Sequence, residues 1–544
     1  MRADFPGVTI QCMLRRRSLA RLVPVVILLI AQLQAAPVPP LQDRIAAVLS
    51  APDLARGFWG IEVTSLATGK LLYSQNSDKL FTPASNTKLF TTAAALALIG
   101  PDYKFRTTVE TTGTLDRYGR LNGDLVLVGH GDPNLSGREL PYDLKTQRND
   151  DPIQALEALA DALVQKGVKF IDGDIVADDS YFAFERYGEG WSQDDLVWAD
   201  GAPVSALTVN DNVVFVNILP ADRPGEKAFV SVKPFAEYYR IDNRIITTPA
   251  GTGRKFFVNR EPGSMLLTLW GNMPQDDAGV NEALAIEDPA EFAAGLFRQL
   301  LEKRGIVIYG HQRTRHTELA TLSTFSVTAI APARGGRLND GVSDKDNGGQ
   351  VRPLKTDQPL VLASYESKPL LQDVRVINKV SQNLHAEILL RLLGRERGNA
   401  GTIEGGLEVL RGFLTQAGIS NDQYVFYDGS GLSRQNLVTP HAIVQLLTYS
   451  ATQPWGADYK SSFPVGGLDG SLTDRLTNPR LQKRIMAKTG SLGGVKTLSG
   501  YATTDSGQVV VFSILSNNFI LPTKRVTDTI DELVQAIVED EAAK

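Results

Sequence analysis

The sequence predicts a mixed α/β protein in which helix-forming and strand-forming stretches alternate along the chain. Residues 90–98 are rich in strong helix formers. Short apolar runs at 59–63 and 125–128 are bounded by polar or glycine-containing segments, which is typical of strands. The 544 residues are enough for about two to four domains.

The first 36 residues have the composition of an export signal. Basic residues at 15–21 precede an apolar run at 22–33, and the small residues Ala35 and Ala36 follow. This order matches the charged, apolar and cleavage regions of a secretory signal. Because the apolar run is too short for a comfortable transmembrane helix, we expect export with removal of residues 1–36; an uncleaved anchor is the alternative.

Charge and residue content exclude several classes of function. Without the five Arg and one Asp of residues 1–36, the formal net charge of −5 becomes −9. We therefore expect no general affinity for nucleic acid. Separately, the short apolar run at 22–33 leaves at most a peripheral contact with membranes as the expectation. The only cysteine, Cys12, lies in the segment expected to be lost, which excludes cysteine catalysis and disulfides in the mature chain. The five histidines lack the H-E-x-x-H spacing of a zinc site, so we expect no metal or cofactor.

The first elements after the signal are a helix, a hairpin and a second helix. Residues 41–55 carry apolar side chains on one side, as a helix does. The runs 59–63 and 71–73 predict two strands joined by a turn at 68–70. Pro83 suits the first turn of the next helix, where its missing N–H costs nothing.

The middle of the chain, from about residue 104, predicts short strands and an internal repeat. Residues 151–173 and 288–310 each begin with Asp-Pro, continue as a helical stretch with a glycine turn, and reach a further glycine 21 residues after the proline. Because helix–turn–strand units are common, chance similarity is the alternative to a true repeat. The strand-rich residues 180–285 between the two units predict a nested domain.

A polar, glycine-rich loop or linker is predicted at residues 333–350. After it, the sequence predicts a helical stretch at 370–393. Buried strands are predicted at 485–487 and 509–515, and a C-terminal helix at 528–542.

Three short motifs predict a catalytic site. They are S-x-x-K at Ser85 to Lys88, S-x-N at 381–383 and K-T-G at 488–490. Ser85 and Lys88 share one helix face because they are three residues apart, and a serine beside a lysine at a helix N-terminus is a nucleophile with its base in reach. Alone, S-x-x-K fits an ordinary polar helix start equally well. All three motifs in this order, each in a suitable predicted element, favour chemistry.

Each residue type has a role in acyl transfer. A free lysine has a pKa of about 10.4, so Lys88 needs burial and a second cation, for which Lys488 is the candidate, to act as a base. Ser381 can relay the proton towards the leaving amine. Asn383 offers a donor and an acceptor to a substrate peptide bond, and Lys488 with Thr489 suits a terminal carboxylate.

The backbone supplies the remaining groups. Gly490 permits a close approach of substrate to its strand. The tetrahedral intermediate needs N–H donors, and those of Ser85 and Ser491 are the candidates for the oxyanion hole.

With these motifs the chain resembles the class C low-molecular-mass penicillin-binding proteins, the D-alanyl-D-alanine carboxypeptidase/endopeptidase family. Ser381 follows Ser85 by 296 residues, far more than a compact β-lactamase has between these motifs. Four further stretches also match the family: Gly131–Leu135, Asp428–Ser433, Pro464–Leu472 and Leu498–Tyr501.

The resemblance implies an α/β (α+β) serine transpeptidase/β-lactamase-like domain. Its antiparallel sheet would carry the K-T-G strand and be flanked by helices, including that of Ser85. Residues 37–105 and 355–544 would form this domain. Residues 106–354 would be an inserted region of two domains, with 180–285 nested.

The resemblance also implies a periplasmic serine DD-peptidase that acts on peptidoglycan stem peptides. Ser85 would attack the penultimate D-alanine, release the terminal one and leave an acyl-enzyme for water to hydrolyse, and it would cut D-alanyl–diamino-acid crosslinks in the same way. β-Lactam antibiotics such as penicillin would acylate Ser85. A β-lactamase or esterase on the same scaffold, or a non-catalytic cell-wall binding protein, are the alternatives.

Five other sequence features need separate interpretation. Asp132 is a turn residue or, by resemblance, binds the free amino group of a diamino acid. For the loops 428–433 and 464–472, the sequence favours a scaffolding role over a role in the chemistry. His385 favours a packed or surface role. Gln382 stands where the motif has Asp, and because its side chain lies between the two that face the site, we expect little effect.

Overall fold

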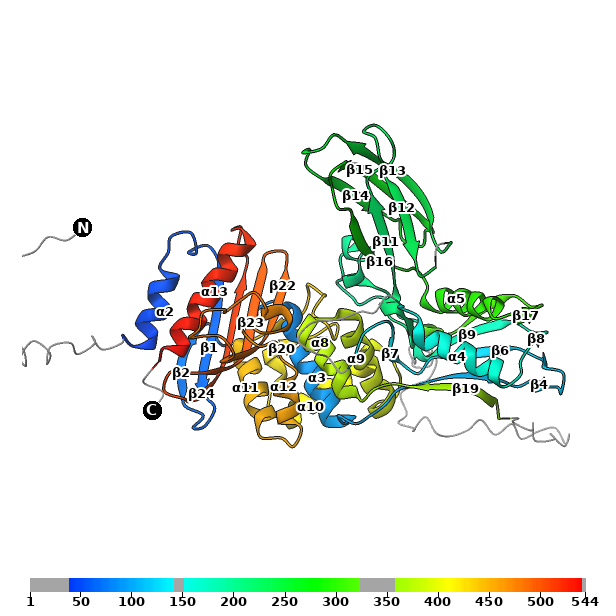
Figure 1. Ribbon diagram of the computed structural model, residues 1–544. Coiled ribbons are helices and arrows are strands. Elements are labelled where there is room, and N and C mark those ends of the chain that lie inside the picture. The colour runs from blue at the N-terminus through cyan, green and yellow to red at the C-terminus, as the bar shows by residue number, and fades with distance from the viewer. Residues whose placement is uncertain (1–38, 141–150, 236, 323–357, 541–544) are drawn as a thin grey trace, which may run out of the picture. The chain divides into compact units, whose positions relative to one another are not determined.

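The computed structural model describes residues 39–140, 151–235, 237–322 and 358–540 (Figure 1). The chain falls into two compact units, Met1–Pro40 and Leu41–Lys544, and the following description concerns the second. The predicted signal segment with Cys12 and the predicted linker 333–350 lie outside the described residues. Within the described ranges, no helix is long and apolar enough to cross a membrane.

A five-stranded antiparallel sheet joins the two ends of this unit and confirms the predicted sheet. Its strand order is β2-β1-β24-β23-β22, and Phe58 lies opposite Asn517 where β1 pairs with β24. The strand of the K-T-G motif, β22, is at one edge. The strands are β1 Phe58–Ser65, β2 Leu71–Gln75, β22 Ile485–Leu492, β23 Val495–Thr503 and β24 Val509–Asn517.

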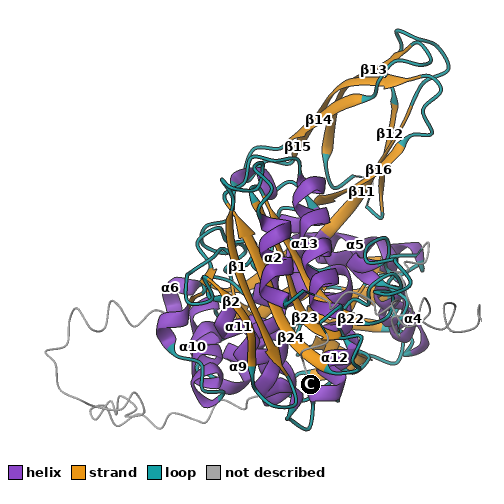
Figure 2. Ribbon diagram, turned by 90° about the vertical axis from the view of Figure 1, so that its left-hand side faces the viewer, coloured by secondary structure: helices purple, strands orange, loops and turns teal. Residues whose placement is uncertain are grey.

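Two terminal helices cover one face of this sheet, α2 (Leu41–Leu49) and α13 (Thr523–Val538), and lie side by side in Figure 2. Apolar side chains of both helices pack on Ile61, Val63 and other strand residues. The predicted boundaries of both helices were wrong. The first helix ends at Leu49 rather than 55, and the last begins five residues before 528 and ends at Val538.

A group of helices covers the other face. It buries an apolar core with strand residues such as Val511 and Leu515. The predicted helix 370–393 is two helices, because Ser381 between them has a left-handed backbone with φ of +64°. The helices are α3 Thr87–Leu98, α8 Leu370–Val380, α9 Asn383–Arg397, α10 Ile403–Gln416, α11 Pro440–Ala451 and α12 Gly456–Ser461. Two short strands, β20 Tyr424–Val425 and β21 Leu437–Val438, pair beside them.

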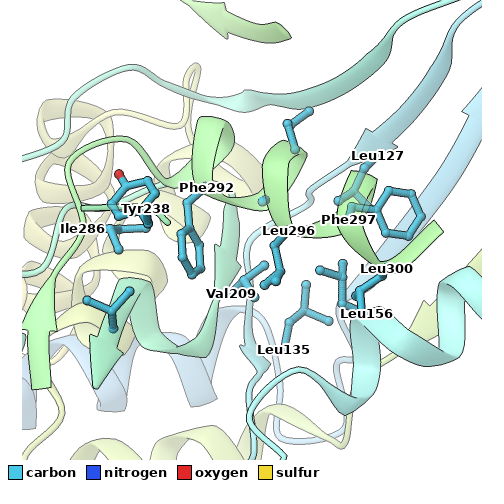
Figure 3. Close-up of a cluster of buried hydrophobic side chains, with 14 of the residues drawn as sticks. Leu127, Leu135, Leu156, Val209, Tyr238, Ile286, Phe292, Leu296, Phe297 and Leu300 are labelled. Atoms are coloured by element: carbon cyan, nitrogen blue, oxygen red, sulfur yellow. The ribbon is translucent and has the colours of Figure 1, made fainter. Parts of the chain in front are cut away.

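The structure confirms the predicted internal repeat. In each copy a helix is followed by two strands, and the second strand of one copy pairs in parallel with the second strand of the other, as do the first strands. Figure 3 shows Leu296 and Leu300 of the second helix gathered with Leu156 of the first. The first copy is α4 Gln154–Gln165, β8 Phe170–Ile171 and β9 Ile175–Ala183; the second is α5 Pro289–Lys303, β17 Val307–Ile308 and β18 Gln312–Thr317.

The strands of the repeat belong to two mixed sheets, ordered β18-β9-β6-β3-β19 and β17-β8-β5-β4. The remaining members are β3 Arg106–Thr111, β4 Thr114–Leu115, β5 Arg120–Asn122, β6 Leu125–Val128 and β19 Leu360–Glu366. A short parallel pair, β7 Asp132–Leu135 and β10 Leu207–Val209, and the helix α6 Leu319–Leu322 complete this region. Because β19 pairs with β3, the predicted boundary at 355 falls just before a strand of the inserted sheet.

The stretch 180–285 is strand-rich, as predicted. It forms two three-stranded sheets, ordered β12-β11-β16 and β13-β15-β14. Their members are β11 Val213–Leu219, β12 Phe229–Lys233, β13 Arg240–Thr248, β14 Lys255–Asn259, β15 Leu266–Pro274 and β16 Val280–Ala285. Its independence as a nested domain, like the other domain limits, stays a prediction.

Candidate active site

Ser85 lies in a tight turn at the start of α3. The turn is a short 3-10 helix, Ala84–Asn86, and Ala84 in it has a left-handed backbone with φ of +48°. Because α3 continues from this turn, Lys88 follows Ser85 by one helical turn, as the motif predicts. Several hydrogen bonds hold the turn to the sheet. Among them, Thr82 N–H donates to Asn517 Oδ1 at 2.8 Å, and Asn86 Nδ2 donates to Ser499 Oγ at 2.7 Å.

The amine of Lys88 is buried against the nucleophile. Its Nζ donates hydrogen bonds to Ser85 Oγ at 2.9 Å, to Asn383 Oδ1 at 2.5 Å and to the carbonyl oxygen of Ser430 at 2.6 Å. A lysine ammonium has three donors, so these contacts use all of them. The first and second motifs are therefore joined through Lys88.

The environment of Lys88 suits a base. Burial lowers the pKa of Lys88 to about 8, although the negative charges of Asp428, Glu387 and Asp200 oppose the shift. The sequence predicted that the charge of Lys488 would help to lower the pKa of Lys88, but Lys488 is not among the causes of this shift. The interaction acts on the other amine instead, because burial and then the charge of Lys88 lower the pKa of Lys488 well below its usual value.

The second motif occupies the turn between α8 and α9. Ser381 has the left-handed conformation noted above, and its Oγ accepts a hydrogen bond from Lys488 Nζ at 2.8 Å. Asn383 begins α9, and its Nδ2 donates to the carbonyl oxygen of Asp200 at 2.9 Å. Both polar groups of the Asn383 amide are thus hydrogen-bonded within the protein, whereas the sequence predicted that they face a substrate.

The third motif lies on β22. Lys488 Nζ also donates to the carbonyl oxygen of Thr489 at 2.8 Å, and Thr489 Oγ1 lies 2.7 Å from Ser471 Oγ. Ser491 Oγ accepts from Lys496 Nζ at 2.6 Å.

Gly490 lets β22 approach the nucleophile turn. A Cβ atom at this position would lie 2.2 Å from Thr497 Oγ1, 2.8 Å from the carbonyl oxygen of Pro83 and 3.1 Å from the backbone nitrogen of Ser85. The glycine is therefore needed by the packing of the protein itself, whereas the sequence interpretation gave this room to substrate. The backbone nitrogen of Ser85 thus lies close to Gly490, the residue before Ser491. The two candidate oxyanion donors, the N–H groups of Ser85 and Ser491, therefore come from neighbouring segments.

A cavity of about 400 Å³ brings most predicted site residues together. It is lined by Ser85, Ser381, Asn383, Thr489, Gly490 and Ser491, together with Val380, Leu492 and Gly493. Lys88 and Lys488 lie beneath it, in contact with the two serine hydroxyls.

Sequence reasoning missed several residues of this cavity. Arg434 and Asp195 line it and form an ion pair at 3.1 Å, and Asp200 lines it as well. Gly431 and Leu432, which also line it, belong to the stretch 428–433 that the sequence singled out. The glycine-rich run 428–433 was the only sequence signal nearby.

The loop that begins at Asp428 acts as scaffolding, as predicted. The carboxylate of Asp428 accepts hydrogen bonds from the backbone nitrogens of Gly431 and Ser433. Glu387 of α9 accepts two more, from the nitrogens of Gly429 and Ser430. These bonds fix the carbonyl oxygen of Ser430 that meets Lys88.

The structure does not bring Asp132 to the cavity of Ser85. Asp132 is buried in β7, where its Oδ1 accepts from the backbone nitrogen of Asn134 at 2.9 Å. Burial raises the pKa of Asp132 to about 7. His385 is a packed residue, as predicted, with its ring buried between Asp373 and Asp211.

Comparisons with known proteins give one matching family model and several relatives. The chain matches the model of the D-Ala-D-Ala carboxypeptidase 3 (S13) family over residues 41–323 and 338–539. It is 33% identical over 488 residues to a D-alanyl-D-alanine carboxypeptidase of Actinomadura sp. (strain R39), covering 88% of this chain and 81% of the relative. It is 25% identical over 478 residues to D-alanyl-D-alanine carboxypeptidase DacB of Haemophilus influenzae, covering 85% of each.

Solved structures show the same fold. The crystal structure of penicillin binding protein 4 from Haemophilus influenzae superposes with a TM-score of 0.72 at 23% identity, covering 92% of this chain and 98% of that one. A structure of the same protein complexed with a β-lactam gives a TM-score of 0.67 at 22% identity over the same shares of the two chains.

Proposed function

The chain belongs to the D-Ala-D-Ala carboxypeptidase 3 (S13) family of serine peptidases, and from this premise we propose that Ser85 is the residue that becomes acylated. The observation that carries the proposal is one hydrogen-bonded arrangement around a single cavity. Lys88 contacts Ser85 and Asn383, and Lys488 contacts Ser381. A hydroxyl with a buried amine in contact is the arrangement that nucleophilic catalysis requires.

The first step is acylation. Neutral Lys88 takes the proton of Ser85 Oγ, which attacks the carbonyl carbon of the penultimate D-alanine. The backbone N–H groups of Ser85 and Ser491 stabilise the negative oxygen of the tetrahedral intermediate. The C–N bond then breaks, and Ser381, in contact with Lys488, relays to the departing amine the proton that Lys88 took from Ser85. Lys88 is then neutral again and Ser381 keeps its hydroxyl.

Deacylation returns the enzyme to its starting state. Water attacks the ester carbonyl, Lys88 accepts a proton from that water, and the proton returns to Ser85 Oγ as the ester bond breaks. Net consumption is one water for each peptide bond.

Peptidoglycan stem peptides are the proposed substrates. Terminal D-alanine leaves in carboxypeptidase action, and a diamino acid leaves when a crosslink is cut. Thr489 lines the cavity and Lys488 lies beneath it, and we propose that the two residues bind the terminal carboxylate of the substrate. We propose that the protein is exported to the periplasm, where this substrate is found, and that β-lactams acylate Ser85.

The test is mass spectrometry after incubation with penicillin. The unchanged chain should gain the mass of one penicillin on the peptide that contains Ser85, and Ser85→Ala should gain none. Ser364→Ala, which removes an exposed hydroxyl from β19, is the matched control and should be labelled like the unchanged chain. Covalent penicillin on Ser85→Ala would refute the nucleophile.

Incubation with purified crosslinked muropeptides tests the substrate. Release of D-alanine or of uncrosslinked monomers would support peptidase action and give the proportion of the two activities. Rapid release of penicilloate with no muropeptide cleavage would indicate a β-lactamase instead.

A further inference from the structure

The inserted region reaches the second catalytic motif through a buried left-handed turn, Asn210–Asn212. Its three residues have φ of +53°, +55° and +54°. This conformation is disfavoured for residues with a Cβ, and single Asn or Asp residues tolerate it best. Three such residues in succession, all buried, mark a position where the surrounding structure imposes the conformation.

The two asparagines fix the turn to its own segment. Asn210 Nδ2 donates to the carbonyl oxygen of Val213 at 2.8 Å, and Asn212 Nδ2 donates to that of Pro203 at 2.8 Å. The carboxylate of the middle residue, Asp211, is directed elsewhere.

Asp211 contacts two residues at the start of α9. Its Oδ2 accepts a hydrogen bond from Gln382 Nε2 at 3.2 Å, and its Oδ1 lies 3.2 Å from His385 Nε2. Arg138 forms a buried ion pair with the same carboxylate. The opposite ring nitrogen of His385 lies 2.6 Å from Asp373 Oδ1 on α8.

Gln382 stands between the two residues of the motif that face the cavity. Its Oε1 accepts from the backbone nitrogen of Leu384 at 2.8 Å and thereby caps α9. Gln382 therefore uses its oxygen on the helix and its N–H on Asp211. A carboxylate at position 382 would turn an oxygen towards the Asp211 carboxylate. The Gln at 382 and the Asp at 211 are therefore a complementary donor–acceptor pair in this chain.

We propose that Asp211 is a positioning residue for the reaction. It acts through Gln382 and His385 to hold Ser381 against the amine of Lys488 and Asn383 against the amine of Lys88. The inference rests on the proposed function. It makes the inserted region a part of the catalytic apparatus rather than an appended module. It also gives the residue between Ser381 and Asn383 a role that the sequence interpretation did not give it.

The test is a reversal of the hydrogen bond between positions 211 and 382. Gln382→Glu keeps the cap on α9 but sets two carboxylates against each other. Asp211→Asn combined with Gln382→Glu restores a donor–acceptor pair with its direction reversed. The measurement is the first-order acylation rate at saturating fluorescent penicillin, together with the melting temperature of each variant.

We expect Gln382→Glu to acylate roughly 10- to 100-fold more slowly, as a misplaced catalytic group does. The double variant should recover roughly fivefold or more of that loss, because contacting residues are not additive. Asp178→Asn is the matched control. It weakens another Asp–Arg pair of the inserted region, with Arg315 at 2.8 Å, and should acylate like the unchanged chain.

Two results would overturn the inference: an unaltered rate for Gln382→Glu, or a double variant that melts like the unchanged chain, despite the lost charge opposite Arg138, and is no faster than Gln382→Glu. Melting temperatures show whether a slow variant is still folded. If the unchanged chain is acylated at Ser85, either result refutes only the role of Asp211. If it is not acylated at Ser85, the proposed function itself fails.

Discussion

Lys488 Nζ donates a hydrogen bond to Ser381 Oγ over 2.8 Å, although the two residues are 107 positions apart in the chain. The contact joins the edge strand β22 to the turn between α8 and α9. A second buried amine, Lys88, makes the equivalent contact with Ser85 at 2.9 Å. The cavity thus has two hydroxyls, each with its own lysine, and the pairs can be tested separately.

Replacing Lys88 with methionine should remove the base and preserve the fold. Methionine is apolar and has a similar length, so the buried site stays filled. Loss of general base catalysis typically lowers a rate by roughly 10²–10⁴-fold, and we expect a loss of that size in acylation by penicillin. Stopped-flow or gel measurement of acylation checks the rate, and circular dichroism checks the fold. Acylation within tenfold of the unchanged chain would exclude Lys88 as the base.

Acylation should increase with pH and level off above about 8. Burial lowers the pKa of Lys88 to about 8. Below that pH the amine carries a proton and has no lone pair to accept the one from Ser85, so the rate should rise about tenfold per pH unit. Above it the neutral amine predominates. The check is the acylation rate between pH 6 and 9.5, with Lys88→Met as the control that should lack this rise. A flat profile for the unchanged chain would contradict the assignment.

Gly490→Ala should lower both activity and stability. The new methyl group would lie 2.2 Å from Thr497 Oγ1 and 3.1 Å from the nitrogen of Ser85, which forces β22 away from the nucleophile turn. Overpacking of this kind typically costs about 1–3 kcal/mol, measurable by urea denaturation.

Gly412→Ala is the control for that substitution. Gly412 lies in α10 with open space around the position of a Cβ, so the change should stabilise by about 0.5–1 kcal/mol and leave acylation unaltered. Equal activity of the two alanine variants would show that the close approach of β22 does not matter.

Asp469→Ala should destabilise the fold strongly. Lys379 near the end of α8 and Asp469 form an ion pair at 2.5 Å, with side chains only 6% and 8% exposed. Removing one partner of a buried pair typically costs about 3–5 kcal/mol, whereas replacing both with apolar residues often costs little. Urea denaturation of Asp469→Ala and of Lys379→Met with Asp469→Leu gives the comparison. A single variant no less stable than the double one would contradict the expected penalty.

The sequence predicted the elements and motifs that depend on local patterns. The hairpin of β1 and β2, the strand of Lys488 and the helix after Ser85 each have their own apolar period or turn residues. The internal repeat was also visible, because its glycines and prolines recur at a fixed spacing. Three motifs in a known order identified five of the residues that line the cavity, Ser85, Ser381, Asn383, Thr489 and Gly490.

What the sequence could not predict depends on contacts between distant segments. Nothing near Ser381 announces its left-handed backbone, which divides one expected helix into two. Asp195 and Asp200 reach the cavity from the inserted region without any motif, and Arg434 follows a run interpreted as scaffolding. The hydrogen bond of the Asn383 side-chain amide within the protein was also missed, because its partner is a backbone carbonyl 183 positions away.

The pairing of β3 with β19 has a consequence for how such a chain could have arisen. Arg106 lies opposite Glu366, so the chain enters and leaves the inserted region at neighbouring points. Ends that lie close together are what allows a segment of this size to be inserted into a chain without moving the residues on either side of it. Removing the inserted region would also remove the carbonyl of Asp200, which accepts a hydrogen bond from Asn383, and the carboxylate of Asp211, which accepts one from Gln382.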